Sequence, residues 1–251
     1  MEGHVHTTVS EGVGTISFFH PQSNSLPGDL LRALAGEVRR AGSDDAIRVV
    51  VLRSEGEKTF CAGASFDELI AIRDLEDGKR FFSGFAEVIN AMRTCPKFII
   101  GRVQGKAVGG GVGLASSVDY CFATTRSSVK LSELAVGIGP FVVGPAVERK
   151  VGVSAMSQMA IHATEWHSAQ WALEKGLYAE IFDRTEDMDA SVHALATRLA
   201  ASNPDAMREL KAVFWQGTEH WDTLLTERAA ISGRLVLSTF TRNAIEAFKG
   251  K

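Results

Sequence analysis

The feature that most constrains the fold is a run of glycines near the middle of the chain, residues 105–114 (GKAVGGGVGL). The apolar run Phe98-Ile99-Ile100 before it predicts a strand, and the apolar residues after it predict a helix that ends near Asp119. Glycines between a strand and a helix leave backbone N–H groups accessible at the helix N-terminus, where the helix dipole favours negative charge. The segment therefore indicates a site for a phosphate or for an oxyanion that forms during a reaction.

The common phosphate-binding glycine motifs do not fit this segment. A dinucleotide-binding G-x-G-x-x-G sequence would need a third glycine, and Ser116 stands at that position. In a P-loop, Gly-Lys is followed by Ser or Thr, whereas Ala107 follows Gly105-Lys106 here. A G-x-S-x-G nucleophile motif is also missing from the sequence.

Composition narrows the class of protein. The chain has 251 residues, of which 45% are hydrophobic and 23% charged, as in an ordinary globular protein. Its net charge of −3 argues against a broad nucleic-acid-binding surface, and its apolar runs are too short to span a membrane. Three cysteines without a C-x-x-C pair, and a start without a signal peptide, predict reduced thiols and a cytoplasmic location. We expect no metal site, because His4-x-His6 lies in an expected frayed terminus and His162 and His167 have unsuitable spacing.

Hydropathy patterns predict an α/β chain whose last part is mainly helical. Glu11-Gly12 is expected to form a hairpin turn, and Asp29 is expected to cap the first helix. The apolar run at 47–52 predicts a strand that is buried on both faces. Further strands are expected at 98–103, 120–123, 128–131 and 178–182, and helices at 75–92, 142–151, 155–176, 189–201, 204–215, 221–237 and 242–249. A change in composition near residue 185 suggests a division into residues 1–185 and 186–251 that pack together.

A second glycine turn, at residues 60–65 (FCAGAS), has the same setting as the first. The order strand, glycine turn and helix thus occurs at 49–71 and again at 98–117. Two such turns can aim one backbone N–H each at the same point, which is the arrangement of an oxyanion hole. The alternative interpretation is tight packing of strands on helices. Small residues that suit either interpretation are Ala62, Gly63, Ala64, Gly109, Gly110 and Gly111.

An oxyanion hole needs an acid or a base beside it, and Glu133 offers a carboxylate on a loop after a short predicted strand. Asp67, Glu68 and Asp119 are alternatives. Asp67 and Glu68 are better explained as residues at the start of a helix, and Asp119 as a residue that ends a helix or turns the chain. The apolar stripe through the helix at 75–92 is interpreted as core packing.

Taken together, these segments resemble the crotonase (enoyl-CoA hydratase/isomerase) superfamily over nearly the whole chain. Four segments carry the resemblance in the right order, and the helical end at 242–248 is a weaker fifth match. The four are Asn24-Ser25-Leu26, residues 48–52 followed by 60–64, residues 105–111 and residues 131–138.

The resemblance implies a crotonase-type spiral of ββα units with a C-terminal α-helical part that covers the site and takes part in assembly. It implies a homotrimer or a dimer of trimers that binds a coenzyme A thioester and stabilises an enolate by two backbone N–H groups, those of Ala64 and Gly110. It places CoA and substrate contacts at Gln22, Ser23, Asn24, Ala62, Gly63, Ser65, Gly109, Gly113, Pro140 and Phe141. Coenzyme A is then part of the substrate, and no separate cofactor is expected.

Departures from the family pattern bear on the reaction. Hydratases of this family carry two glutamates, one of which follows the G-G-G turn by two residues; Gly113 stands there, while Glu133 matches the other. Ser65 replaces a frequent acidic residue, and the apolar residues 138–145 around Pro140 and Phe141 predict a reshaped acyl pocket. A single carboxylate beside an oxyanion hole favours double-bond isomerisation, with hydration still open. The alternatives are a decarboxylase or thioesterase of the same superfamily, or a non-catalytic acyl-CoA-binding homologue.

Overall fold

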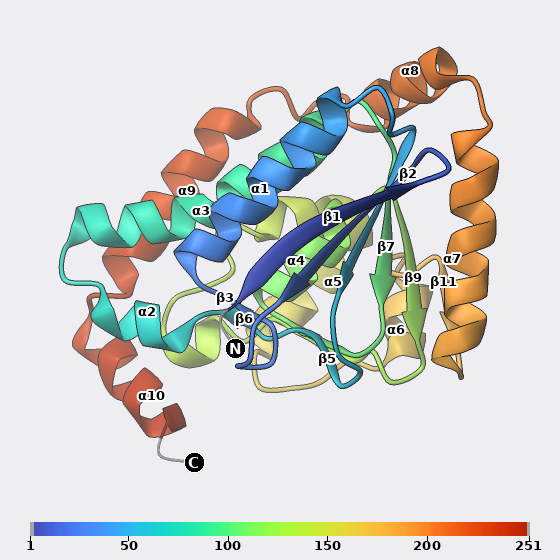
Figure 1. Ribbon diagram of the computed structural model, residues 1–251. Helices are drawn as coiled ribbons and strands as arrows, with labels where there is room; N and C mark the ends of the chain where they lie inside the picture. The colour runs from blue at the N-terminus through green and yellow to red at the C-terminus, as the bar shows by residue number, and fades with distance from the viewer. Residues whose placement is uncertain (1–2, 250–251) are drawn as a thin grey trace.

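The computed structural model describes residues 3–249 of the chain (Figure 1). Its main sheet has the strand order β1-β2-β4-β7-β9-β11, and only the β1–β2 pair is antiparallel. The predicted hairpin turn at Glu11-Gly12 is confirmed, with φ angles of 51° and 79°. The strands are β1 (His4–Ser10), β2 (Val13–Phe19), β4 (Val49–Ser54), β7 (Ile99–Val103), β9 (Tyr120–Thr124) and β11 (Glu180–Phe182).

Short strands form two further small sheets. One has the order β10-β8-β5, and the other pairs β3 with β6. The chain repeatedly places a strand in the main sheet, then a strand in a small sheet, then a helix, so that the ββα units follow one another as a spiral. The predicted repeat of residues 49–71 at 98–117 is part of this pattern. The short strands are β3 (Ser25–Leu26), β5 (Thr59–Cys61), β6 (Gly63–Ala64), β8 (Lys106–Val108) and β10 (Val129–Lys130).

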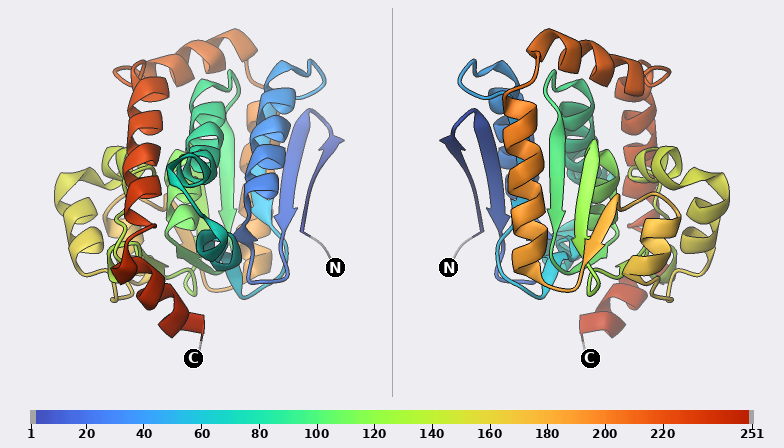
Figure 2. Two further views of the ribbon diagram at one scale, coloured as in Figure 1. Left: turned by 90° about the vertical axis from the view of Figure 1, so that its left-hand side faces the viewer. Right: turned by 90° about the vertical axis from the view of Figure 1, so that its right-hand side faces the viewer.

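Helices cover both faces of the main sheet (Figure 2). Helices α1 (Gly28–Ser43) and α3 (Leu75–Thr94) lie on one face and α7 (Thr185–Ala200) lies on the other. Side chains of β4 alternate between the two: Val50 and Leu52 pack on the side of α1 and α3, and Val49 and Val51 pack on the side of α7. The prediction that this strand is buried on both faces is confirmed.

The remaining helices lie around the main sheet. They are α2 (Phe66–Ala71), α4 (Gly110–Ser117), the 3₁₀ turn η1 (Leu134–Val136), α5 (Gly144–Ile161), α6 (Ala169–Glu174), α8 (Pro204–Phe214), α9 (Trp221–Leu235) and α10 (Thr239–Lys249). Helix α8 crosses the end of the sheet from the side of α7 to the side of α9 (Figure 2). There α9 crosses α3 closely, because a Cβ atom added to Gly78 would lie 2.7 Å from the Cα atom of Gly233. The division of the chain at residue 185 stays a prediction.

Three local predictions are wrong. Asp29 does not cap α1: Pro27 is the N-cap residue, and Asp29 lies in the first turn of the helix. A single helix at 155–176 does not form, because His167 pairs with Val129 in an antiparallel bridge that separates α5 from α6. The expected fraying at His4 and His6 does not occur, since both residues lie in β1 and are held by its ladder with β2.

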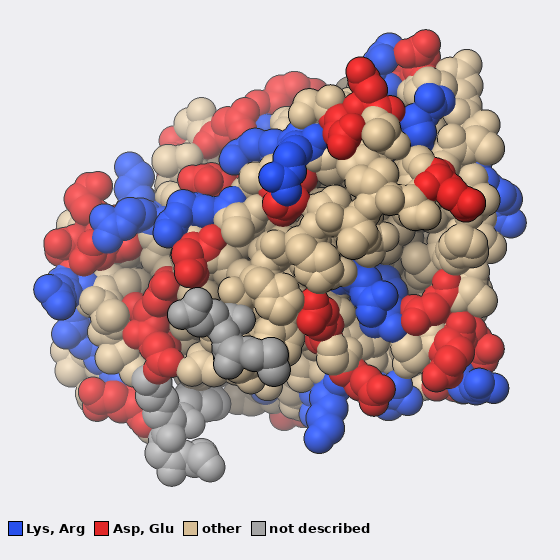
Figure 3. Space-filling model, in the orientation of Figure 1, with Lys and Arg blue, Asp and Glu red and all other residues tan. Residues whose placement is uncertain are grey.

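Acidic and basic side chains are interspersed over the face of the molecule shown in Figure 3. Within residues 3–249, none of the helices has the length and apolar character that a membrane span requires. Cys61, Cys95 and Cys121 are buried and free, as the cysteine pattern predicts.

Candidate active site

The two glycine turns contact each other, as their matching sequence settings predict. Gly63 has a φ angle of +88°, and a Cβ atom added there would lie 2.8 Å from the carbonyl oxygen of Val108 and 3.4 Å from the amide nitrogen of Gly110. Gly110 is the first residue of α4, whose first N–H groups have no acceptor within the helix. The backbone of the first turn therefore lies directly against the N-terminus of the helix that follows the second.

Close packing explains why Gly110 has no side chain. A Cβ atom on Gly110 would lie 2.2 Å from Cε1 of Phe85. Its neighbour Gly109 adopts φ 51° and ψ −113° and donates its N–H to the carbonyl oxygen of Lys130 at 2.9 Å, which ties the turn to β10. The glycines thus allow tight packing between the two turns, and their role in an oxyanion hole stays a prediction.

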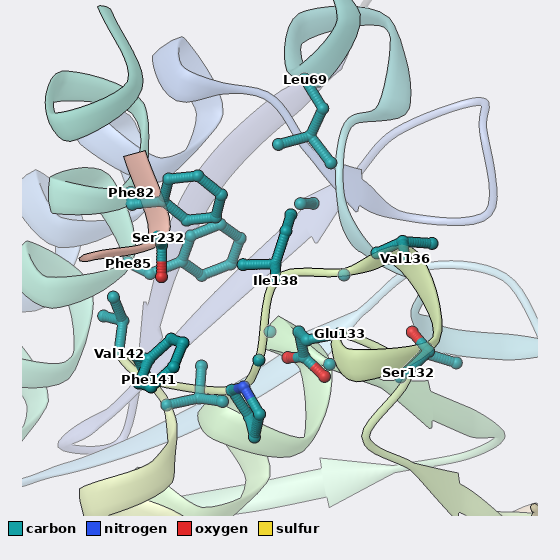
Figure 4. A pocket seen from close by; sticks show the side chains of 18 of the residues that line it. Leu69, Phe82, Phe85, Ser132, Glu133, Val136, Ile138, Phe141, Val142 and Ser232 are labelled. Carbon is teal, nitrogen blue, oxygen red and sulfur yellow. The ribbon is translucent and has the colours of Figure 1, made fainter. Parts of the chain in front are cut away.

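A cavity of about 100 Å³ opens at this place (Figure 4). Eight of the predicted site residues line it: Ala62, Gly63, Ala64, Gly109, Gly110, Glu133, Pro140 and Phe141. The rest of the lining is mostly apolar and comes from α2, α3, β8, η1 and the segment before α5: Phe66, Leu69, Phe82, Phe85, Val108, Val136, Ile138, Val142 and Val143. Gly139, Ser132 and Ser232 complete it.

Glu133 is the ionisable residue of the cavity lining. It lies between β10 and η1, and its Oε1 would be 3.0 Å from a Cβ atom added to Gly109. Its Oε2 is inaccessible to solvent and accepts no hydrogen bond from the described part of the chain. Burial raises the pKa of this carboxyl to about 7 from 4.5. A carboxyl with such a pKa exchanges protons readily near neutral pH, which suits a general acid or base.

Gly113 lies one helical turn beyond Gly109, outside the cavity lining. A Cβ atom added to it would lie 2.6 Å from Cγ1 of Val143 and 2.8 Å from Cβ of that residue. Val143 itself lines the cavity. The valine side chain therefore occupies the space into which a side chain at position 113 would point.

The predicted CoA-contacting loop supports the first glycine turn from outside the cavity. The carbonyl oxygen of Ser23 accepts the N–H of Ala62 at 3.1 Å, and Asn24 donates to the carbonyl oxygens of Glu55 and Thr59. Gln22 donates to Asp67 at 2.7 Å. Contacts of Gln22, Ser23 and Asn24 with a ligand stay a prediction.

Ser65 has a clear structural task, because it caps α2 by accepting the N–H of Glu68. Of the alternative carboxylates, Glu68 accepts the N–H of Gly28 at 2.8 Å. Asp119 accepts from Ile99 N–H, Trp215 Nε1 and Lys211 Nζ at 2.7, 2.9 and 2.9 Å. These bonds agree with the interpretation of Glu68 and Asp119 as structural residues.

Sequence reasoning missed several residues that line the cavity. The apolar stripe of α3 is core, as interpreted, yet its members Phe82 and Phe85 also line the cavity. Ser232 comes from α9, about a hundred residues beyond Glu133, and its position depends on how α9 crosses α3. The spacing of phenylalanines alone could not separate core from cavity, and no local motif marks Ser232.

Comparison with known proteins agrees with the fold and identifies the family. The family model described as enoyl-CoA hydratase/isomerase matches residues 8–250, so the chain belongs to the enoyl-CoA hydratase/isomerase family. A solved structure of an enoyl-CoA hydratase from Mycobacterium avium is 27% identical, with a TM-score of 0.85 over 98% of this chain and 96% of that one. The predicted crotonase-type spiral of ββα units is thereby confirmed.

Two similar proteins carry names that specify different substrates. The short-chain-enoyl-CoA hydratase of Clostridium acetobutylicum is 26% identical over 94% of this chain and 90% of its own length. The mitochondrial methylglutaconyl-CoA hydratase of Rattus norvegicus is 31% identical over 78% of this chain. The match spans 63% of the length of that rat protein.

Proposed function

We propose that this chain is an acyl-CoA enzyme of the enoyl-CoA hydratase/isomerase type. The observation that carries the proposal is the Glu133 carboxylate, whose Oε2 is buried without a hydrogen-bond donor among the described residues and whose Oε1 lies against the Gly109 turn. Burying such a group costs free energy, so a functional task explains its retention. Family membership supplies the substrate class, a CoA thioester.

In the proposed reaction, the N–H groups of Ala64 and Gly110 donate to the thioester oxygen. Ionised Glu133 takes a proton from C2 of a 3-enoyl thioester, and the electron pair moves to the thioester oxygen, giving a dienolate. Protonated Glu133 then returns the proton to C4, which leaves the double bond between C2 and C3. An oxyanion-hole donor typically contributes about 10²–10³-fold to kcat, and general acid–base transfer about 10²–10⁴-fold.

The packing of Val143 against Gly113 favours isomerisation over hydration. Hydration by two carboxylates requires a second acid near position 113, and the valine fills that space. A hydratase reaction would need another group to hold the water. The proposed site uses no cofactor besides the CoA thioester itself.

The test is a side-by-side assay of the purified protein on 2-enoyl-CoA and 3-enoyl-CoA. We expect isomerisation of the 3-enoyl substrate to exceed hydration of the 2-enoyl substrate, and Glu133→Gln to lose at least 10²-fold in turnover while still binding CoA thioesters. Glu57→Gln, at an exposed glutamate outside the cavity, is the matched control. Hydration faster than isomerisation would make hydration the main reaction. Wild-type turnover in Glu133→Gln would refute the role of this residue.

Two other results would assign a different function. Turnover of malonyl-type or saturated acyl-CoA substrates would identify a decarboxylase or a thioesterase. Saturable binding of CoA thioesters without turnover across the panel would identify a non-catalytic homologue.

We also propose that the protein acts in the cytoplasm as a homotrimer or a dimer of trimers, with residues 186–251 contributing to assembly and site cover. The free, buried thiols support a reducing compartment. Large apolar residues exposed on α8 and α10, among them Leu210, Val213 and Phe240, support burial against partner subunits. Light scattering after size exclusion measures the assembly, and a monomer at micromolar concentration would contradict it.

A further inference from the structure

Ser232 places a hydroxyl group in the apolar part of the cavity. The residue is only 1% exposed, yet it belongs to the cavity lining. Its hydroxyl makes no hydrogen bond to any residue in the described part of the chain, unlike Ser117 and Ser157, which donate to a backbone carbonyl of their own helix. A hydroxyl that lines a cavity and has no partner in the protein can donate a hydrogen bond to, or accept one from, a ligand that enters the cavity.

The position of this hydroxyl is fixed by backbone packing. The next residue, Gly233, meets Gly78 of α3 so closely that a Cβ atom on Gly233 would lie 2.6 Å from the amide nitrogen of Lys79. Helix α9 is thereby held against α3 at the level of Ser232. In Figure 4, Ser232 lies on the side of the cavity where Phe82 and Phe85 lie, and Glu133 lies on the opposite side of the view.

Charge is scarce around this end of the cavity. The lining contains no lysine, arginine or histidine within residues 3–249, and Glu133 is its one ionisable residue. A carboxylate on the ligand would lose its hydration here without gaining a cation. A neutral oxygen, by contrast, would pair with the Ser232 hydroxyl and leave the apolar contacts intact.

We propose that Ser232 is a specificity-determining residue that hydrogen-bonds a neutral oxygen function, such as a hydroxyl or a ketone, on the acyl part of the CoA thioester, away from the thioester group. The proposal rests on the proposed function, because it takes the cavity to hold the acyl part. With this role for Ser232, the preferred substrate is a CoA thioester whose acyl group is short and carries an additional oxygen.

Binding of saturated thioesters tests the proposal without relying on turnover. Each ω-hydroxyacyl-CoA, with chains of four to six carbons, is paired with the acyl-CoA in which a methyl replaces the hydroxyl, and Kd is measured by calorimetry. At one chain length or more, the wild type should bind the hydroxy compound more tightly than its isostere. Ser232→Ala should raise the Kd of the hydroxy compound by about 3- to 10-fold and change the Kd of the isostere by less than 2-fold.

Thr226→Ala is the matched control, because it removes a hydroxyl from an exposed position of the same helix. Its Kd values should equal those of the wild type. Equal binding of hydroxy compound and isostere by the wild type at every chain length overturns the proposal, even if Ser232→Ala does not fold. An equal loss of affinity for both ligands in Ser232→Ala overturns the proposal as well. Tighter binding of an ω-carboxyacyl-CoA than of its isostere by the wild type also overturns it.

The two proposals fail in different ways. Acyl-CoA binding without hydroxyl selectivity, together with turnover of enoyl-CoA, refutes the role of Ser232 and leaves the proposed function in place. Absence of acyl-CoA binding in the wild type refutes both.

Discussion

The stability of the protein should reveal the cost of keeping Glu133 ionisable. A pKa of about 7 in place of 4.5 means that ionising this carboxyl in the folded protein costs about 3 kcal/mol more than in the unfolded chain. Above pH 7 the folded protein carries this cost in full. As the pH falls from 7 to 4.5 the folded carboxyl is already protonated while the unfolded one gains its proton, so the cost disappears.

Glu133→Gln removes the ionisation and keeps the shape of the side chain. At pH 8 we expect the variant to be more stable than the wild type by about 3 kcal/mol, or roughly 6–12 °C in Tm. At pH 5.5 the gain should fall to about 1 kcal/mol. Urea unfolding at a series of pH values measures the difference, and the same variant should have lost turnover.

Glu57→Gln again serves as the control, with an expected change within about 0.5 kcal/mol at both pH values. The reasoning is refuted if Glu133→Gln is less stable than the wild type at pH 8, or if its gain is the same at pH 5.5 and pH 8. Either result would mean that the carboxylate is solvated or paired in the folded protein.

Two substitutions and one labelling experiment test the packing further. Gly113→Ala should destabilise the protein by about 1–3 kcal/mol, but should be neutral or stabilising in a Val143→Ala background, in a double-mutant cycle by urea unfolding; additive effects would contradict the contact. Lys211→Met should cost about 3–5 kcal/mol because the buried Asp119 carboxylate loses its ion-pair partner, and adding Asp119→Asn should recover part of that loss; a cost under 1 kcal/mol would show the ion pair to be unimportant. Burial raises the pKa of Cys61 to about 12, so a thiol reagent at pH 8 should label it only after unfolding, and rapid labelling of the native protein, located by peptide mass, would contradict this.

The sequence predicts the parts of the site that depend on local backbone chemistry. Both glycine turns follow buried strands, and parallel strands of neighbouring ββα units bring such turns together, so the contact of Gly63 with the Gly110 turn could be expected. The apolar runs also locate the buried strands, because a strand covered on both faces must be apolar at every position.

What the sequence cannot predict depends on packing between distant segments. The break between α5 and α6 depends on the pairing of His167 with Val129, which no local propensity reveals. The contribution of Ser232 depends on the crossing of α3 and α9 at two glycines more than 150 residues apart. The raised pKa of Glu133 depends on burial, while the same residue type at most other positions is solvated.

The contact between Gly113 and Val143 also limits how this active site can change by mutation. A larger residue at position 113 alone meets the valine, and a smaller residue at position 143 alone removes a packed side chain from the cavity wall. Either first step lowers stability before a second carboxylate can act. A second carboxylate at position 113 therefore requires a compensating change at position 143, so the two positions should change together.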